Sequence, residues 1–147
     1  MNVLQDIVTN KCLVVPFLLW LSIQIIKFIT DFIINRKFNF KRLLGAGGMP
    51  SSHSAVVTSL AVCMGKNYGF DSGIFALSMI MALVVMYDAA GVRRAAGKQA
   101  RILNKIMENP ELTTIEVQEK LIEALGHTPV QVFVGAIIGI IAGALVG

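Results

Sequence analysis

Long runs of apolar residues, separated by shorter polar segments, dominate the chain. Three of them, residues 12–34, 72–87 and 130–147, are close to the ~20 residues with which a helix crosses ~30 Å of hydrocarbon. A fourth run, 54–64, reaches a spanning length only if residues 66–68 lie at the interface or its start is sunk below the membrane surface. The pattern predicts an all-α integral membrane bundle of about four transmembrane helices in a single domain, residues 1–147. We expect these helices at about 12–34, 53–66, 72–96 and 129–147.

The polar segment at about 97–126 has a helical pattern of its own. Its pieces ILNKIM and IEVQEKLIEAL place apolar residues at helical spacing, and Asn109-Pro110 separates the two pieces. We therefore expect two short amphipathic helices on the membrane surface before the last span. A plain solvated hairpin is the alternative.

Composition supports the membrane class. The chain is 55% hydrophobic with a mean hydropathy of +0.71, and 15% of its residues are charged, against ~25% in soluble domains. The first ten residues lack a basic region, and no small-residue cleavage site follows the first apolar run, so we expect that run to be a retained span. Both cysteines fall in apolar runs, which predicts buried thiols. The two histidines show no metal-ligand spacing, and we expect no metal, no cofactor and no nucleic-acid partner.

Basic residues decide the expected orientation. Ten of the thirteen lie on the side that holds the 35–52 connector and the polar segment, whereas Lys11 and Lys66 lie on the other side and Lys27 is inside the first helix. The ten are Arg36, Lys37, Lys41, Arg42, Arg93, Arg94, Lys98, Arg101, Lys105 and Lys120. The positive-inside rule therefore predicts a multi-pass protein of the cell membrane, with the connector side in the cytoplasm and both termini outside.

The stretch GGMPSSHSA, residues 47–55, holds one of the two histidines at the start of the second helix. In the expected topology His53, His127 and the pair Arg93-Arg94 converge on the cytoplasmic face. A phosphate monoester needs cations and N–H groups for its oxygens, a nucleophile in line with the ester bond, and an acid for the leaving oxygen. Two histidines can supply the nucleophile and the acid, and a helix N-terminus suits an anion.

A purely structural interpretation of the same residues stays open. Ser51 or Ser52 can simply cap the second helix, and His127 can be an interfacial histidine that precedes the cap of the last helix. The stretch GAGGMPSS lacks the Gly-Lys-Ser/Thr ending of a nucleotide P-loop, which excludes ATP binding by that route.

Three linked motifs resemble a known family. GGMPSSHSA is similar to the Pro-Ser-Gly-His motif of the type 2 phosphatidic acid phosphatases and vanadium haloperoxidases, with Ser52 in place of the glycine. GHTPVQVFVGAIIGIIAG, residues 126–143, resembles the last motif of that superfamily. Together with VVMYDAAGVRRAAGKQA, these motifs look like its divergent branch, small membrane proteins described as acid phosphatase and vanadium haloperoxidase related. The similarity covers roughly residues 40–143.

The resemblance implies a role for each matching residue. His127 would be the nucleophile that forms a phosphohistidine, and His53 would be the acid for the leaving alcohol. No metal is implied. The residues that would hold the phosphate oxygens are Ser51, Ser52, Arg93 or Arg94, and Lys41 or Arg42.

The chain departs from the family pattern in three places. The arginine of the last motif normally lies a few residues before the nucleophilic histidine, whereas Arg94 lies 33 residues before His127. The first motif, a lysine followed at fixed spacing by Arg-Pro, is not present as such, because Lys41-Arg42 leads to Leu-Leu-Gly. The aspartate that the family places four residues after the nucleophile is here Gln131.

Gln131 and Asp88 each allow two interpretations. A Gln131 carbonyl can accept the imidazole N–H and fix the tautomer, but it cannot balance an imidazolium. The sequence Thr128-Pro129-Val130-Gln131 also matches a capping box, which is the interpretation we favour. Asp88 can orient His127 or pair with one of the two neighbouring arginines, and we favour the ion pair.

Two further patterns concern the spans. Lys27 and Asp31 are four residues apart in the first helix, which is most simply a mutual pair inside the membrane. Glycines at every fourth residue of the last helix form a smooth face for close helix contact. We favour packing within the chain for this face, and a homodimer is the alternative. The glycines are Gly135, Gly139, Gly143 and Gly147.

The sequence therefore predicts a metal-independent phosphatase that acts on a lipid phosphomonoester, because residues at the membrane ends of three helices can meet a head group in place. A non-catalytic lipid-phosphate binder or transporter is the alternative, and Gln131 favours it. A scaffold for partner helices explains the glycine face but not the histidines.

Overall fold

The computed structural model describes residues 2–36, 48–108, 121 and 126–147, and every regular element among them is an α-helix. This confirms the all-α fold class. The elements are α1 (Val3–Thr9), α2 (Lys11–Asn35), α4 (Ser52–Tyr68), α5 (Gly73–Ala90), α6 (Val92–Met107) and α7 (Pro129–Val146).

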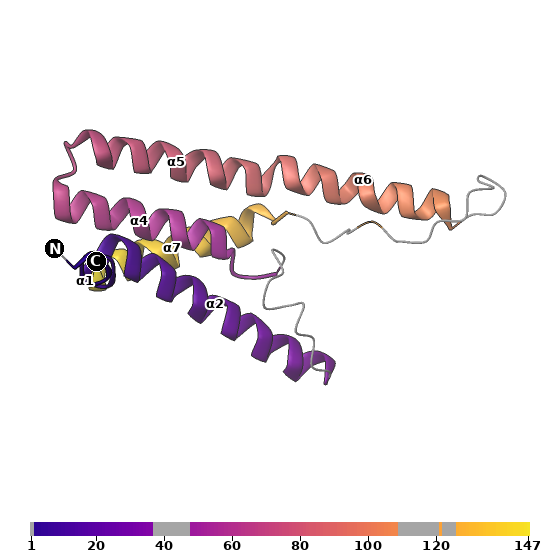
Figure 1. Cartoon of the computed structure of the whole chain (residues 1–147). Helices are drawn as coiled ribbons and strands as arrows, with labels where there is room; N and C mark the ends of the chain where they lie inside the picture. Colours follow the sequence, from indigo (N-terminus) through magenta and orange to yellow (C-terminus); the bar gives the residue numbers. More distant parts are fainter. Residues whose placement is uncertain (1, 37–47, 109–120, 122–125) are drawn as a thin grey trace.

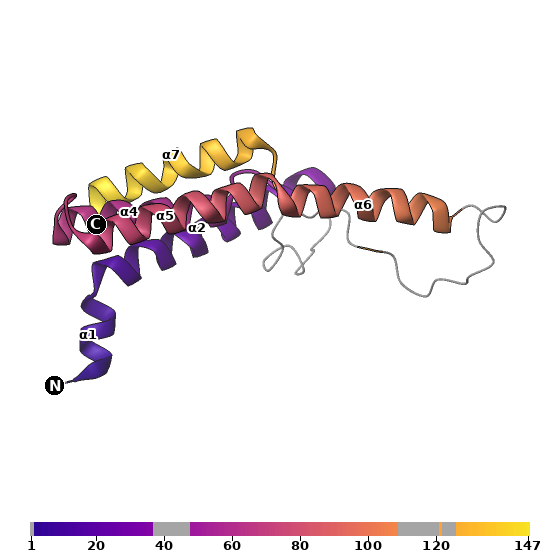
Figure 2. The same cartoon turned by 90° about the horizontal axis from the view of Figure 1, so that it is seen from above.

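Four helices lie side by side and alternate in direction (Figure 1). The chain crosses the bundle along α2, returns along α4, crosses again along α5 and returns along α7, so its two termini lie at the same end. The short α1 lies before this bundle, at the end where the termini are (Figure 2). The starts of α4 and α7 therefore share the opposite end with the end of α5.

Three helical stretches are long and apolar enough to cross a membrane, namely Lys11–Asn35, Gly73–Met107 and Pro129–Val146. The 17-residue α4 is not among them, so the expected fourth span is not shown. Its place explains its composition. It contacts α2, α5 and α7, and its buried positions are mostly small residues that let neighbouring backbones come close.

The third helix ends later than the sequence led us to expect. Instead of stopping at 96, the chain turns slightly at Gly91 and continues as α6 to Met107, which extends beyond the bundle (Figures 1 and 2). The segment ILNKIM thus belongs to this extension, because residues 98–108 contain neither glycine nor proline before Asn109-Pro110. The segment IEVQEKLIEAL lies outside the described residues except for Leu121, whose backbone N–H and C=O pair with the Asn104 side chain at 3.0 and 2.9 Å.

The glycine face of α7 packs against α4 within the chain. A Cβ at Gly135 would meet the carbonyl oxygen of Ser51, and one at Gly139 would meet Ala55 O and the Thr58 hydroxyl. Thr58 also donates from Oγ1 to Ala136 O at 3.1 Å. The face proposed as an alternative dimer contact is therefore covered by α4, as the interpretation we favoured requires.

Candidate functional site

The candidate site lies where the starts of α4 and α7 meet the end of α5. Two backbone hydrogen bonds join the three segments: Ser51 N donates to Gln131 O at 3.1 Å, and His127 N donates to Ala89 O at 2.9 Å. Gly126 makes the second bond possible. Its φ is +81°, and a Cβ there would meet the backbone of Arg93 and Arg94. His53 and His127, 74 positions apart in sequence, are thereby brought to the same place.

The start of α4 is a capped helix end whose serine side chains are buried. Ser51 is the N-cap, and its Oγ accepts from Ser54 N at 3.3 Å and from Ser54 Oγ at 3.0 Å. This confirms the capping interpretation for Ser51. Ser51 and Ser52 are 0% and 2% exposed, so both hydroxyls face the protein interior. The Ser51 hydroxyl is engaged in the cap, whereas Ser52 Oγ faces α2.

Gln131 serves His127 and the cap of α7 at the same time. Its Oε1 accepts from Thr128 N at 3.0 Å, while Gln131 N donates to Thr128 Oγ1 at 3.3 Å, so the capping box is complete. The same Oε1 lies 3.3 Å from His127 Nδ1. The two interpretations of Gln131 are therefore compatible, and the geometry contains both.

This geometry assigns the tautomer of His127. The backbone N–H of Thr128 can only donate, which identifies the facing atom of the Gln131 amide as its oxygen. An oxygen accepts, so His127 Nδ1 carries the proton and the lone pair of the neutral ring lies on Nε2. His127 is 2% exposed, and within the described part of the chain its Nε2 has no hydrogen-bond partner.

The environment of His127 favours its neutral form. Burial is the largest effect and lowers the pKa of the imidazole, and the positive charges of Lys27 and Arg93 lower it further. The hydrogen bond to Gln131 acts in the opposite direction and raises the pKa. The net shift is downward, so Nε2 is available as a lone pair near neutral pH. The rings of His53 and His127 are neighbours, with their centroids 6.2 Å apart and their planes inclined by 58°.

The remaining predicted residues divide into three groups. Asp88 accepts from Arg93 Nε at 2.6 Å, which confirms the favoured ion pair. The charge of Arg93 acts on both histidine rings, and the backbone of both Arg93 and Arg94 lies against Gly126. Lys41 and Arg42 lie outside the described residues.

Sequence reasoning missed one residue at this place, Lys27. It is 3% exposed, and its Nζ donates to Ser52 Oγ at 3.5 Å across the α2–α4 contact. The sequence predicts a pair of Lys27 with Asp31, and that prediction does not reveal the contact with Ser52. The signal that could have found it is a lysine in the middle of an apolar span, which is expensive unless it serves a function.

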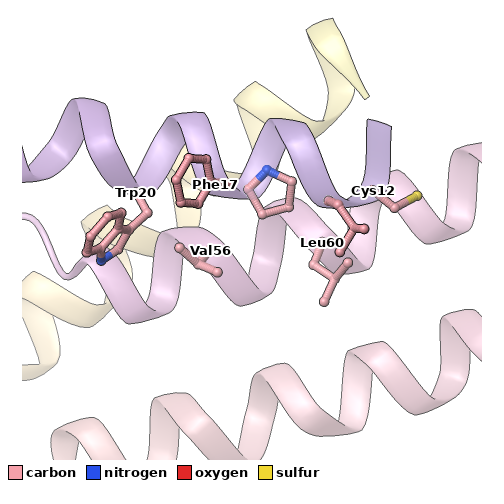
Figure 3. Close-up of a pocket in the computed structure, with 7 residues that line it drawn as sticks. Cys12, Phe17, Trp20, Val56 and Leu60 are labelled. Atoms are coloured by element: carbon pink, nitrogen blue, oxygen red, sulfur yellow. The ribbon is translucent and has the colours of Figure 1, made fainter. Parts of the chain in front are cut away.

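An apolar cavity of about 310 Å³ lies between α2 and α4 (Figure 3) and contains none of the predicted site residues. Trp20 and Phe17 line it from α2, and Val56 and Leu60 line it from α4. Val56 lies one helical turn after Ser52, so the cavity begins close to the buried serines. Among the described residues no cluster of three or more His, Cys, Asp or Glu could hold a metal ion.

The fold and the site define a small multi-pass membrane protein with two neighbouring histidines at one end of its bundle. The chain belongs to the divergent PAP2 family, whose profile matches residues 8–142. It is similar to the uncharacterized membrane protein YuiD of Bacillus subtilis (strain 168). The two are 40% identical over an alignment that covers 93% of this chain and 94% of the relative. No solved structure matches the chain. The resemblance seen in the three sequence motifs is thus confirmed at the level of the family.

Proposed function

We propose that this protein is a membrane-embedded, metal-independent phosphatase that hydrolyses a lipid phosphomonoester through a phosphohistidine. The observation that carries the proposal is the state of His127: its Nδ1 is held by Gln131, its Nε2 is buried and unpartnered within the described residues, and its ring neighbours that of His53. Family membership makes a phosphatase plausible. The start of α4 adds backbone N–H groups that suit a phosphate.

In the proposed reaction, the lone pair of His127 Nε2 attacks phosphorus while the bond to the lipid oxygen breaks. Burial lowers the pKa of His53, and the charges of Arg93 and Lys27 lower it further, whereas a bound phosphate dianion acts in the opposite direction. Protonated His53 gives its proton to the lipid oxygen, so the alcohol leaves neutral. Neutral His53 then takes a proton from water, which attacks the phosphohistidine and releases inorganic phosphate. His127 returns to its neutral form and His53 to its protonated form.

The test is phosphate release by purified protein from phosphatidate, phosphatidylglycerophosphate and a polyprenyl phosphate, with a chelator present. We expect release by the wild type, a loss on the order of 10³-fold or more in His127→Ala, and a loss of ~10²- to 10⁴-fold in His53→Ala. Trapping of ³²P on His53→Ala, but not on His127→Ala, would identify the nucleophile. Release that survives both substitutions would exclude the mechanism.

The alternative is a lipid-phosphate binder or transporter on the same scaffold. The specific observation that favours it is Gln131, because an amide cannot balance the positive charge that forms on His127 during turnover. Binding of lipid phosphate without any phosphate release, in wild type and variants alike, is the result that would select this function.

We assign Arg93, in preference to Arg94, to the phosphate. The charge of Arg93 lowers the pKa of both histidines, and its side chain lies at the corner next to them, paired with Asp88. Arg93→Gln should therefore raise KM for the lipid phosphate by about tenfold or more, as expected for loss of a charged hydrogen bond, and Arg94→Gln should change it little. Equal effects of the two substitutions would contradict this assignment.

We further propose that the site faces the cytoplasm. Five basic residues lie on α6 at the site end, whereas Lys11 and Lys66 lie at the other end. Both native cysteines are buried, so an introduced thiol should label above a low background. In intact cells an impermeant maleimide should label Asn2→Cys but not Glu108→Cys, and the reverse pattern would overturn the orientation.

A further inference from the structure

Lys27 is a buried cation within a candidate membrane span. It is 3% exposed and lies eight residues before the end of α2 at Asn35, which corresponds to about 12 Å along the helix axis. An ammonium group at such a place is costly, and its burial is compensated by anions or strong acceptors. The three donors of the ammonium group can be shared among several acceptors at this depth.

The lysine points to the same buried surface as the histidines. Its Nζ lies 3.5 Å from Ser52 Oγ, at the first residue of α4, and Ser52 is 2% exposed. The Lys27 charge acts on both His53 and His127. A contact with Asp31, one turn further along α2, is compatible with this placement, because an ammonium has three donors.

A second observation at this place points independently to a ligand. His127 is 2% exposed, and its Nε2 atom has no hydrogen-bond partner within the described part of the chain. A buried nitrogen lone pair from the segment just before α7, a buried ammonium from α2 and the N–H end of α4 thus lie at the same end of the bundle. Of common biological groups, a phosphoryl group accepts from the ammonium and the N–H groups and presents phosphorus to the lone pair.

We propose that Lys27 is a binding residue that, together with Ser52 and the N-terminus of α4, holds a phosphoryl group below the membrane surface. The inference deepens the proposed function and rests on it for the identity of the reaction. It specifies a substrate whose phosphate enters the bundle between α2 and α4, beside the apolar cavity that begins at Val56. A phosphorylated lipid meets this requirement, because its chain can remain in the apolar region while its phosphate reaches Lys27.

The test is binding, which does not depend on turnover. Inorganic phosphate would be titrated calorimetrically into wild type, Lys27→Met, Lys27→Arg and the control Lys105→Met, which removes one exposed charge at the same end of the molecule. We expect Kd to rise at least tenfold in Lys27→Met, to recover in part in Lys27→Arg and to stay unchanged in Lys105→Met. An unchanged Kd in folded Lys27→Met would overturn the proposal.

A measurement on the wild type covers the case in which Lys27→Met fails to fold. The ¹⁵Nζ signal of Lys27, assigned by its absence from Lys27→Arg, should shift when phosphate is added, whereas the signal of Lys105 should not. A Lys27 signal that stays unmoved at saturating phosphate would overturn the proposal without any further variant.

Two further arms separate this inference from the proposed function. His127→Ala should lose turnover but keep phosphate binding that depends on Lys27. If the wild type binds phosphate through Lys27 but shows no turnover, the phosphatase proposal is refuted and Lys27 remains a binding residue. Phosphatidate in nanodiscs should compete with inorganic phosphate. If it does not, the site takes a soluble phosphate and the lipid part of the inference is wrong.

Discussion

Two of the three helices that contact α4, namely α7 and α5, are both strongly apolar but make contact in different ways. Along α7 the buried residues are Gly135, Gly139 and Gly143, which bring its backbone against the backbone of α4. Along α5 only Ser78, Ala82 and Ala89 are buried, and large side chains such as Leu77 and Val84 are 70% and 61% exposed. Both helices direct large apolar side chains outward, and Phe133 of α7 is 66% exposed. They differ in that α7 meets α4 with its backbone, whereas the buried positions of α5 carry side chains.

This difference shows what holds the site together. In a bilayer, apolar side chains gain little by leaving lipid for protein, so close backbone packing and interhelical hydrogen bonds decide which helices associate. The α4–α7 contact has both, with glycines against carbonyl oxygens and Thr58 bonded to Ala136 O. The two histidines stand at the end of this contact, which makes it the rigid frame of the site.

The largest effect should follow from filling the α4–α7 contact. In Gly139→Val the new side chain would overlap Ala55 O and the Thr58 hydroxyl, and overpacking of this kind costs about 1–3 kcal/mol or more. We expect loss of most of the folded protein in thermal unfolding followed by circular dichroism. The matched control is Gly73→Ala at the start of α5, where nothing lies within 4 Å of the added Cβ. Equal stability of the two variants would contradict the comparison.

A second pair of variants separates the cap from the histidine at the start of α7. Thr128→Ala and Gln131→Leu each remove half of the capping box and should each lower the free energy of unfolding by ~1 kcal/mol. Only Gln131→Leu also releases His127 Nδ1. On the proposed function it alone should reduce kcat, by ~10- to 100-fold, the scale seen for partners that orient functional histidines at metal sites. Equal kcat values for the two variants would refute the orienting role.

Much of the frame could be predicted from the sequence. The apolar runs gave three spans, the four-residue glycine spacing indicated the face of α7 that packs closely, and Thr128 and Gln131 indicated the cap. The course of the chain near Gly91 could not be predicted as easily, because a single glycine at the end of an apolar span fits both a helix end and a slight turn within a helix. The structure selects the turn, since α6 follows at once.

The two histidines of the site could also be predicted from the sequence, whereas the place of Lys27 required the structure. GGMPSSHSA and GHTPVQ contain both histidines, and their meeting follows from the alternating direction of the helices. The position of Lys27 could not be read in this way. A lysine and an aspartate four residues apart predict a local pair equally well, and only the α2–α4 packing shows that Nζ reaches Ser52.

The pH dependence of the free energy of unfolding tests the burial of His127 at the end of the α4–α7 contact. Burial lowers the pKa of folded His127 below its unfolded value of about 6.5. The folded state thus binds a proton less readily than the unfolded state. The contribution of neutral His127 to the free energy of unfolding is therefore fully present above a pH of about 6.5 and is lost as the pH falls toward the folded pKa, by no more than about 1.4 kcal/mol per pH unit. Tm of the wild type should therefore drop more between pH 7 and 5.5 than Tm of His127→Gln. Parallel curves would show that His127 is not the group responsible.

The smallest effect should come from the ion pair at the α5–α6 corner. Arg93 and Asp88 are 47% and 37% exposed in their side chains, and pairs in such surroundings contribute about 0–1 kcal/mol. Asp88→Asn should lower the free energy of unfolding by no more than that, and the difference should vanish in 1 M salt, where charges are screened within ~3 Å. The cost of Gly139→Val, which is steric, should stay the same in salt. If Asp88→Asn instead costs as much as Gln131→Leu at high salt, the corner belongs to the rigid frame and the contrast between α5 and α7 is weaker than their packing indicates.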